Sequence, residues 1–442
     1  MAGMQEKSTD TASIAVPTFA EALRVWMKIG LLSFGGPAGQ IALMHKTLVD
    51  EKKWIDETRY LTALNFCMLL PGPEAMQLAT YVGWRLHGLK GGLAAGLLFV
   101  IPGAVVMLVL SMLYAAFGQL PIAEALLLGV KAAVLAIVVE ALLRIARRGL
   151  KARADQALAA AAFVAIFFFD VPFPVIVLAA AIFGYLRAGA AGPGGAAVAA
   201  LPAPVPIGQT LRTVAAWLAI WIVPLAAVAV LFGSKHILTE IGWFFSKLAV
   251  VTFGGAYAVL AYMAQDVVQA HKWLQAGEMV DALGLAETTP GPLILVTQFV
   301  GYQAAYRLGG GTPWIMGTLG ALVTLWATFA PCFLWIFAGA PYVERLHSEP
   351  RLKAALAGVT AAVVGVILNL TVWFALHVLF ARVTETHAGP LKLTVPDPAS
   401  LSPRALVLAV LAVVLLFGLH RGIITTLGIC GGLAIVWHLA LG

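Results

Sequence analysis

The most restrictive feature of this sequence is its succession of long apolar runs, such as LFVIPGAVVMLVLSMLYAAF over residues 98–117. A helix needs about 20 apolar residues to span a bilayer. Of the 442 residues, 61% are hydrophobic and only 11% are charged, whereas soluble domains have about 45–50% apolar and about 25% charged residues. The sequence therefore predicts an all-α, polytopic membrane protein. It excludes a soluble enzyme, a nucleic-acid-binding domain and a disordered chain.

The apolar runs predict about thirteen transmembrane segments. They cover residues 19–44, 60–88, 91–117, 121–144, 156–170, 172–187, 212–233, 238–263, 279–306, 313–340, 351–380, 404–418 and 421–441. Pro-Gly-Pro interrupts segments 60–88 and 279–306. Proline lacks an N–H donor and clashes with the preceding turn, so these segments are predicted to be discontinuous helices.

An internal repeat organises these segments. SFGG at 33–36 recurs as TFGG at 252–255, and PGP at 71–73 recurs at 290–292, both at an offset of 219 positions. Later matches, at an offset of 229, pair Pro102 with Pro331, Pro121 with Pro350 and Gly129 with Gly358. Six segments in each repeat with one unpaired segment between them would invert the second repeat, as in many secondary transporters.

This repeat predicts the domain organisation. An N-terminal tail (1–18) precedes the first membrane repeat (19–187), and an Ala/Gly/Pro linker (188–211) leads to the unpaired helix (212–233). The second membrane repeat takes residues 234–442. Within it, residues 381–403 contain four prolines and are predicted to form a long loop.

The distribution of basic residues predicts the orientation. The densest basic loop, residues 144–153, should be cytoplasmic. If every segment spans, the N-terminus is cytoplasmic and the C-terminus periplasmic. The loop 45–59 then lies outside although it carries four Lys and Arg residues, unless segment 60–88 is re-entrant.

The paired motifs resemble a known family. KIGLLSFGGPAGQIALMH, LLPGPEAMQLATYVGWRLHG and their echoes KLAVVTFGGAYAVLAYM and ETTPGPLILVTQFVGY are similar to the chromate ion transporter family, in particular to its long, two-domain branch. The resemblance implies a bacterial inner-membrane (plasma-membrane) protein that exports chromate and confers resistance to it. Sulfate is the related anion in that family's proposed chemistry.

The broken helices predict an anion site. A helix that restarts after a break presents free N–H groups and a positive dipole end, which bind anions. We expect the four breaks to converge near the bilayer midplane, although a plain turn or close glycine packing would give the same motifs. Lys28 and Lys247 are equivalent cations near the FGG motifs, and with Arg24 they either line the path or reach the headgroups.

The acidic residues nearest the PGP motifs are Glu74 and Glu287. Glu74 either caps its half-helix through the helix dipole or titrates when an anion binds. Neutral side chains can donate to an oxyanion or merely join helices. The complete candidate path is Arg24, Lys28, Ser33, Gly35, Gly36, Asn65, Pro71, Gly72, Pro73, Glu74, Gln77, Lys247, Thr252, Gly254, Gly255, Glu287, Thr288, Thr289, Pro290, Gly291 and Pro292.

No sequence motif indicates an enzyme, a metal site or a cofactor, and no P-loop is present. The expected partners are chromate, the lipid bilayer, and sulfate or protons as coupling ions, without nucleic acid. A transporter of sulfate or another oxyanion, in either the outward or the inward direction, and a passive anion channel remain alternatives. The oligomeric state stays open, with a homodimer among the options.

Overall fold

The computed structural model describes residues 17–190, 206–251, 253, 256–343, 350–389 and 391–441. The first half is a series of helices. They are α1 (Phe19–Leu32), α2 (Gly36–His45), the π-helix η1 (Lys46–Glu51), α3 (Glu57–Cys67), α4 (Glu74–Phe117), α5 (Pro121–Gly149), α6 (Arg153–Phe169) and α7 (Phe173–Ala190). α4 consists of two helices that meet at a kink at His87 and Gly88.

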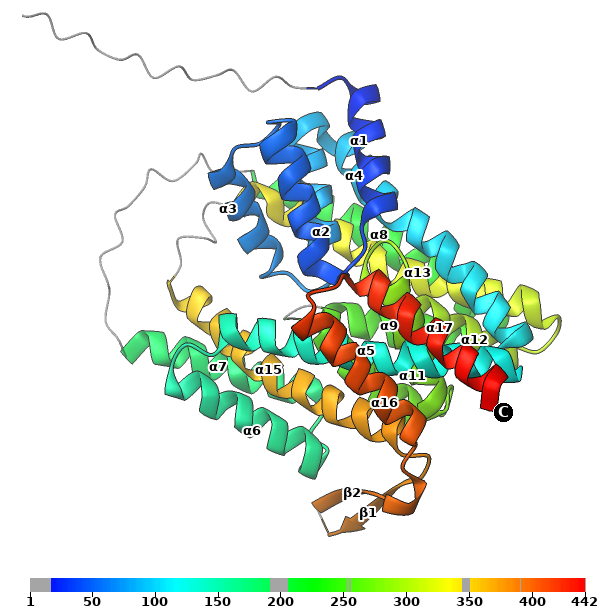
Figure 1. Cartoon of the computed structure of the whole chain (residues 1–442). Helices are drawn as coiled ribbons and strands as arrows, with labels where there is room; N and C mark the ends of the chain where they lie inside the picture. Colours follow the sequence, from blue (N-terminus) through cyan, green and yellow to red (C-terminus); the bar gives the residue numbers. More distant parts are fainter. Residues whose placement is uncertain are drawn as a thin grey trace, which may run out of the picture.

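α8 (Ile207–Phe232) joins the first half to the second. The second half comprises α9 (Ile237–Val251), α10 (Ala256–Gln265), η2 (Asp266–Ala270), α11 (Ala276–Thr288), η3 (Leu293–Leu295), α12 (Val296–Leu308), α13 (Pro313–Gly339), η4 (Ala340–Tyr342), α15 (Pro350–Leu379), β1 (Val383–Ala388), β2 (Leu391–Pro396), η5 (Pro398–Ser400), α16 (Pro403–Val413), η6 (Val414–Gly418) and α17 (Ile423–Leu441). Figure 1 shows how these elements are arranged and labels both strands and every α-helix except α10.

Long apolar helices make this an all-α, polytopic membrane protein, as predicted. Among the described residues, six helices are long and apolar enough to cross a membrane, namely Glu74–Phe117, Pro121–Gly149, Ile207–Phe232, Pro313–Tyr342, Pro350–Leu379 and Ile423–Ala440. Only 6% of the most apolar stretch of α8 is buried inside the protein. Such an apolar and exposed helix is stable in lipid rather than in water.

The predicted breaks in the first half are confirmed. α1 ends at Leu32 and α2 begins at Gly36, and Gly35 between them has a φ of 85°. Gly72 in the first PGP has a φ of 113°. Side chains rarely adopt such angles, so glycine allows the chain to turn within the membrane. Thr252, Gly254 and Gly255 of the second FGG motif lie outside the described residues.

The order of elements recurs in the second half, including a π-helix directly after the second short helix. Lys53 and Lys272, which the offset of 219 pairs, both have a φ of 53°. Asp170 and His420 also share positive φ, of 53° and 49°, between the last two helices of each half. Rare backbone angles at matched positions support two halves of like fold. Their inversion and the number of membrane crossings stay predictions.

The first half contains two broken segments, α1 with α2 and α3 with the first part of α4. The start of the first segment lies next to the end of the second. The backbone oxygen of Pro17, before α1, lies 2.9 Å from Nε2 of His87, at the kink of α4. Between these ends, Lys52 in the loop before α3 forms an ion pair of 2.8 Å with Glu21 in the first turn of α1. Start, middle and end therefore lie on one side, which favours two re-entrant helical hairpins over two spans.

The second half repeats this arrangement. Nε2 of His236, before α9, lies 3.1 Å from the backbone oxygen of Gly309, after α12. Trp273, in the loop before α11, packs its ring against Phe244 of α9 with 5.3 Å between the ring centroids. The broken segments of both halves thus share one architecture.

The last helices of each half pack on the other half. α6 and α7 pack against α15, while α16 and α17 pack against α5. A Cβ atom at Gly129 of α5 would lie 2.3 Å from the backbone oxygen of Cys430, and one at Gly358 of α15 would lie 2.4 Å from that of Ala180. These glycines occupy matched positions. Such a reciprocal exchange is typical of a two-fold relation.

The segment 381–403 differs from its predicted loop. β1 and β2 form an antiparallel hairpin, in which Val383 is opposite Pro396. Three of the four prolines that predicted a loop mark element boundaries instead, since Pro396 ends β2, Pro398 begins η5 and Pro403 begins α16. Pro390 lies outside the described residues. In Figure 1 the hairpin lies at the bottom, beyond the end of α15 and far from α1 to α3.

The glycine contacts give a prediction for stability. Two effects oppose each other in Gly129→Ala and Gly358→Ala. Alanine favours a helix over glycine by about 1 kcal/mol, but overpacking a close contact costs about 1–3 kcal/mol. We expect the overpacking to outweigh the helix preference, so both variants should lower the unfolding temperature in detergent. Gly432→Ala in α17 is the control, since no atom lies within 4 Å of its added Cβ. Equal melting of all three variants would contradict the packing argument.

Candidate functional site

A cavity of about 1090 Å³ lies between the two halves. Its walls come from α2, α3, the C-terminal end of α5 and the N-terminal end of α15. Polar and charged lining residues are His45, Lys46, Asp50, Tyr60, Asn65, Glu74, Arg144, Arg148, Lys151, Asp155, Tyr257, Lys353 and Thr360. The space is large enough for a hydrated small ion rather than for a single water molecule.

The inner end of the cavity is formed where helices restart. Gly35 and Ala38 mark the start of α2, Gly72 and Glu74 the start of α4, and Tyr257 the start of α10, and all five line the cavity. The N-terminal turns of three helices therefore border one space. Since the first N–H groups of a helix have no partner within it, each of these helix ends contributes positive potential to this part of the cavity.

The second PGP motif is hydrogen-bonded to the first FGG break through its backbone. The N–H of Gly291 donates to the backbone oxygen of Ser33 over 2.8 Å. Nε2 of Gln40 in turn donates to the oxygen of Gly291 over 2.5 Å. The breaks at 33–36 and 290–292 are far apart in the sequence, but the first break and the helix after it thus provide hydrogen-bond partners for the backbone of Gly291. The other PGP is held by α13, where Sγ of Cys332 would lie 2.9 Å from a Cβ atom at Gly72.

Basic side chains surround the outer part of the cavity. Arg148, Lys151 and Lys353 line it, and no ion pair joins any of them within the described part of the chain. Arg144 pairs with Glu140 on its own helix. Sequence reasoning assigned the loop 144–153 to membrane orientation alone and did not single out Lys353. The cluster was visible in the sequence, but its place beside α15 was not.

The acidic lining residues are partly compensated. Asp155 forms an ion pair of 2.9 Å with Arg187, and Asp50 lies 3.5 Å from His45. Glu74 is half-buried at the inner end of the cavity. No ion pair to Glu74 occurs among the residues that the structure describes, so it is the acidic group that an anion there would meet.

Glu287 lies just behind the cavity wall. Its side chain is 4% exposed, and Oε1 accepts a hydrogen bond of 3.0 Å from the Tyr257 hydroxyl. Oε2 has no hydrogen-bond partner among the described residues. Tyr257 also approaches the first break, since a Cβ atom at Gly36 would lie 3.4 Å from its hydroxyl oxygen.

Several predicted path residues lie elsewhere. Arg24 and Lys28 are exposed on α1, and Lys247 is exposed on α9 with Nζ 5.6 Å from the ring centre of Tyr262. The three cations are absent from the cavity lining. This position fits the alternative in which they reach the headgroups, and their place in the path stays a prediction.

The predicted neutral donors divide into two groups. Asn65 is exposed to the cavity. Gln77 is buried and its Nε2 donates to the backbone oxygen of Pro71 over 2.7 Å. The hydroxyls of Thr288 and Thr289 donate to carbonyl oxygens at the end of their own helix. Pro71, Pro73, Pro290 and Pro292 are buried with their glycines. Within the described residues, no group of three His, Cys, Asp or Glu side chains could hold a metal ion.

Broken helices that meet around a charged cavity inside an apolar helix bundle place this protein in the class of membrane transporters. The chromate transporter family model matches residues 20–185 and 239–436. The chain belongs to the chromate transporter family.

Relatives support this assignment. A chromate transport protein of Pseudomonas aeruginosa is 33% identical over 395 residues, which are 87% of this chain and 88% of the relative. A chromate transport protein of Cupriavidus metallidurans is 30% identical over 366 residues, or 81% and 83% of the two chains. An uncharacterized transporter of Methanocaldococcus jannaschii is 26% identical over 358 residues, or 80% and 83%. No solved structure matches this chain.

The backbone at the first PGP gives a prediction for activity. We expect Gly72→Ala to abolish chromate flux in proteoliposomes while the protein still inserts, because its φ of 113° and the nearby Cys332 leave no room for a methyl group. Gly310→Ala is the matched control. Gly310 also has positive φ, of 65°, but no atom lies within 4 Å of its added Cβ. Equal flux in both variants would show that the geometry of this break is not needed.

Proposed function

We propose that this protein exports chromate from the cytoplasm across the bacterial inner membrane and thereby confers resistance to it. One observation supports this more than any other. Three helix N-termini border a single cavity between the two halves, together with three cations that form no ion pair within the described residues, Arg148, Lys151 and Lys353. A site of this composition suits a small dianion and repels cations.

Anion recognition would take place in two stages. Arg148, Lys151 and Lys353 at the outer part would raise the local concentration of anions by attraction over several ångströms. The N–H groups at the starts of α2, α4 and α10 would then bind the desolvated oxyanion. These backbone dipoles do not change with pH. Because chromate and sulfate share shape and charge, such a site would separate them only weakly, and sulfate is an expected competitor.

The orientation follows from charge. Lys46 lies in the cavity wall with Arg148, so the loop 45–59 opens on the same side as the loop 144–153. Both basic loops would then be cytoplasmic, as the positive-inside rule requires. The re-entrant arrangement removes the conflict that a spanning segment 60–88 creates. We place the N-terminus in the cytoplasm, the C-terminus in the periplasm and the cavity open to the cytoplasm.

The membrane potential would suffice to drive export. A dianion that leaves a negative interior gains about 4.6 kcal/mol per 100 mV, at roughly 2.3 kcal/mol for each charge. This corresponds to a concentration ratio above about a thousandfold. Strict exchange for sulfate would be electroneutral and would forgo this drive. Glu74 opposes a bound anion unless it is protonated, so affinity that falls as the pH rises is expected.

Flux of labelled chromate in right-side-out and inverted vesicles tests the proposal, with the potential and sulfate varied separately. Export requires faster uptake into inverted vesicles when their lumen is made positive. Preference for sulfate would instead establish a general oxyanion transporter. Flux in the inward direction alone would overturn the proposed direction.

The cations of the cavity give a prediction for kinetics. Arg148→Gln and Lys353→Gln should each lower the initial rate of chromate flux, by up to about tenfold at low ionic strength, because they remove an attractive charge from the entrance. The loss should shrink at high salt. Lys235→Gln removes the same charge from the loop between α8 and α9, outside the cavity, and should leave the rate unchanged.

A further inference from the structure

A second, much smaller cavity lies at the opposite end of the protein. Its volume is about 30 Å³, against about 1090 Å³ for the first. The repeat offsets relate the two linings to each other. Ala42, Lys46, Asp50, Ala141 and Arg144 of the large cavity correspond to Ala261, Gln265, Gln269, Leu370 and Trp373 of the small one. The two cavities are therefore the same part of each half, open in one and closed in the other.

The helices α3 and α11 make the first difference. α11 packs against α5 and α15, and a Cβ atom at its Gly284 would lie 2.8 Å from Cγ1 of Val130. α3, the counterpart of α11, packs mainly on α4 and leaves Thr360 of α15 exposed to the large cavity. Of this pair of equivalent helices, α11 is packed against α5 and α15, whereas α3 is separated from α15 by the large cavity.

An ion pair fixes the closed helix. Nζ of Lys131 on α5 lies 2.9 Å from Oδ1 of Asp281 on α11, and the hydroxyl of Tyr114 donates to Oδ2 over 2.9 Å. Asp281 is 6% exposed. At the open cavity, the positions that match Lys131 and Asp281 are Thr360 and Thr62. The charged contact therefore exists only on the closed side.

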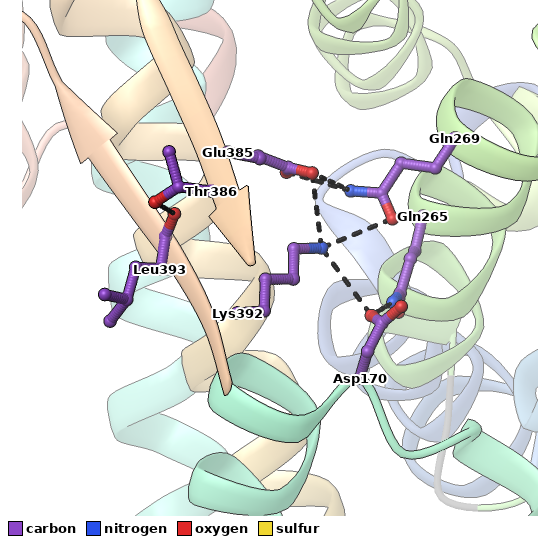
Figure 2. A network of polar contacts seen from close by, with 7 residues as sticks. All are labelled: Asp170, Gln265, Gln269, Glu385, Thr386, Lys392 and Leu393. Atoms are coloured by element: carbon purple, nitrogen blue, oxygen red, sulfur yellow. Dashed lines mark hydrogen bonds and ion pairs between the residues drawn. The ribbon is translucent and has the colours of Figure 1, made fainter. Parts of the chain in front are cut away.

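The hairpin adds a second contact farther out. Figure 2 shows Lys392 of β2 pointing between Gln269 and Asp170. Its Nζ lies 3.3 Å from Oε1 of Gln269, 3.6 Å from Asp170 and 3.5 Å from Glu385. Lys392 is 7% exposed although it lies on a surface hairpin. The first half has no counterpart of this hairpin, since α6 begins four residues after α5 ends.

We propose that these two contacts, Lys131–Asp281–Tyr114 and Lys392–Asp170–Glu385, are the inner and outer layers of the gate that closes the periplasmic side. This inference rests on the proposed transport function and assigns further residues to it. Transport requires α11 to leave α5 while α3 closes on α15, so that the anion meets one open side at a time. The two halves exchange the conformations that the structure shows in each.

The chemistry of the contacts suits a gate. A buried ion pair is only weakly stabilising, because desolvation of the two charges offsets their attraction. Water that enters an opening gate would solvate both partners again, so separation is less costly than that of a packed apolar interface. Once freed from their carboxylates, Lys131 and Lys392 would also present ammonium groups to the departing anion. The gate thus holds its cations neutralised until it opens.

Two matched alanines allow a direct test. Ala42 on α2 is exposed to the large cavity, and its counterpart Ala261 on α10 is 3% exposed beside the small one. In full-length protein with Cys67, Cys332 and Cys430 replaced by alanine, we would introduce Ala42→Cys or Ala261→Cys. A membrane-impermeant maleimide then measures reactivity in vesicles of known sidedness. We expect fast labelling of the first variant and slow labelling of the second.

Gate variants should reverse this order. Asp281→Asn or Lys392→Gln should raise the labelling rate of Ala261→Cys by at least about tenfold and lower that of Ala42→Cys, which needs a shift of about 1.4 kcal/mol in the equilibrium between the two states. Arg382→Gln is the control, because it breaks the 2.8 Å ion pair with Asp397 beside the same hairpin but outside the network. The charge exchange Lys131→Asp with Asp281→Lys should restore slow labelling.

Unchanged labelling of Ala261→Cys in both gate variants would overturn the gate, and so would an increase in the Arg382→Gln control of equal size. The labelling does not depend on which anion is carried. If the gate variants reverse the labelling pattern but the protein with its gate residues intact carries no chromate, the gate is retained and the proposed substrate is refuted. Normal flux with unchanged labelling would retain the substrate and refute the gate.

Discussion

The structure depends on one constraint: backbone groups freed by a helix break cannot stay unsatisfied inside a membrane. Each break in this protein therefore needs protein around it. The N–H of Gly291 meets this need by bonding to Ser33 of the other half, over 2.8 Å. Because the breaks of one half are covered by the other, the two halves form a single unit. The place where they meet is also where free helix ends are concentrated.

Close approach between the halves depends on glycine rather than on large side chains. Gly129 and Gly358 let helices of opposite halves touch through their backbones. Lipid surrounds such helices with a solvent as apolar as their side chains, so van der Waals packing rather than the hydrophobic effect holds them together. The interface is consequently tight at a few small residues and leaves a large cavity elsewhere. A tight contact beside a cavity allows one helix to shift without dissolving the whole interface.

Much of the fold could be predicted from the sequence, since apolar length and paired motifs are local signals. The helix limits lie close to the predicted segments, and the breaks at 33–36 and 71–73 are where proline and glycine require them. The cations of the cavity could not be predicted as a group. Arg148 serves membrane orientation equally well, and only the packing of α5 against α15 brings it into the same cavity as Lys353. The hairpin was missed because its prolines hide the alternation of LKLTV at 391–395.

The hairpin makes the two halves unequal. It adds contacts around Lys392 on one side that the other side lacks. In the gate proposed above, these contacts would favour the conformation whose cavity opens towards the basic loops over the opposite conformation. Such a bias cannot change the concentration ratio that a passive transporter finally reaches. It would change the conformation that the protein adopts without bound anion, in which most binding sites would face one compartment. Low concentrations of anion there would then be captured more readily than equal concentrations on the far side.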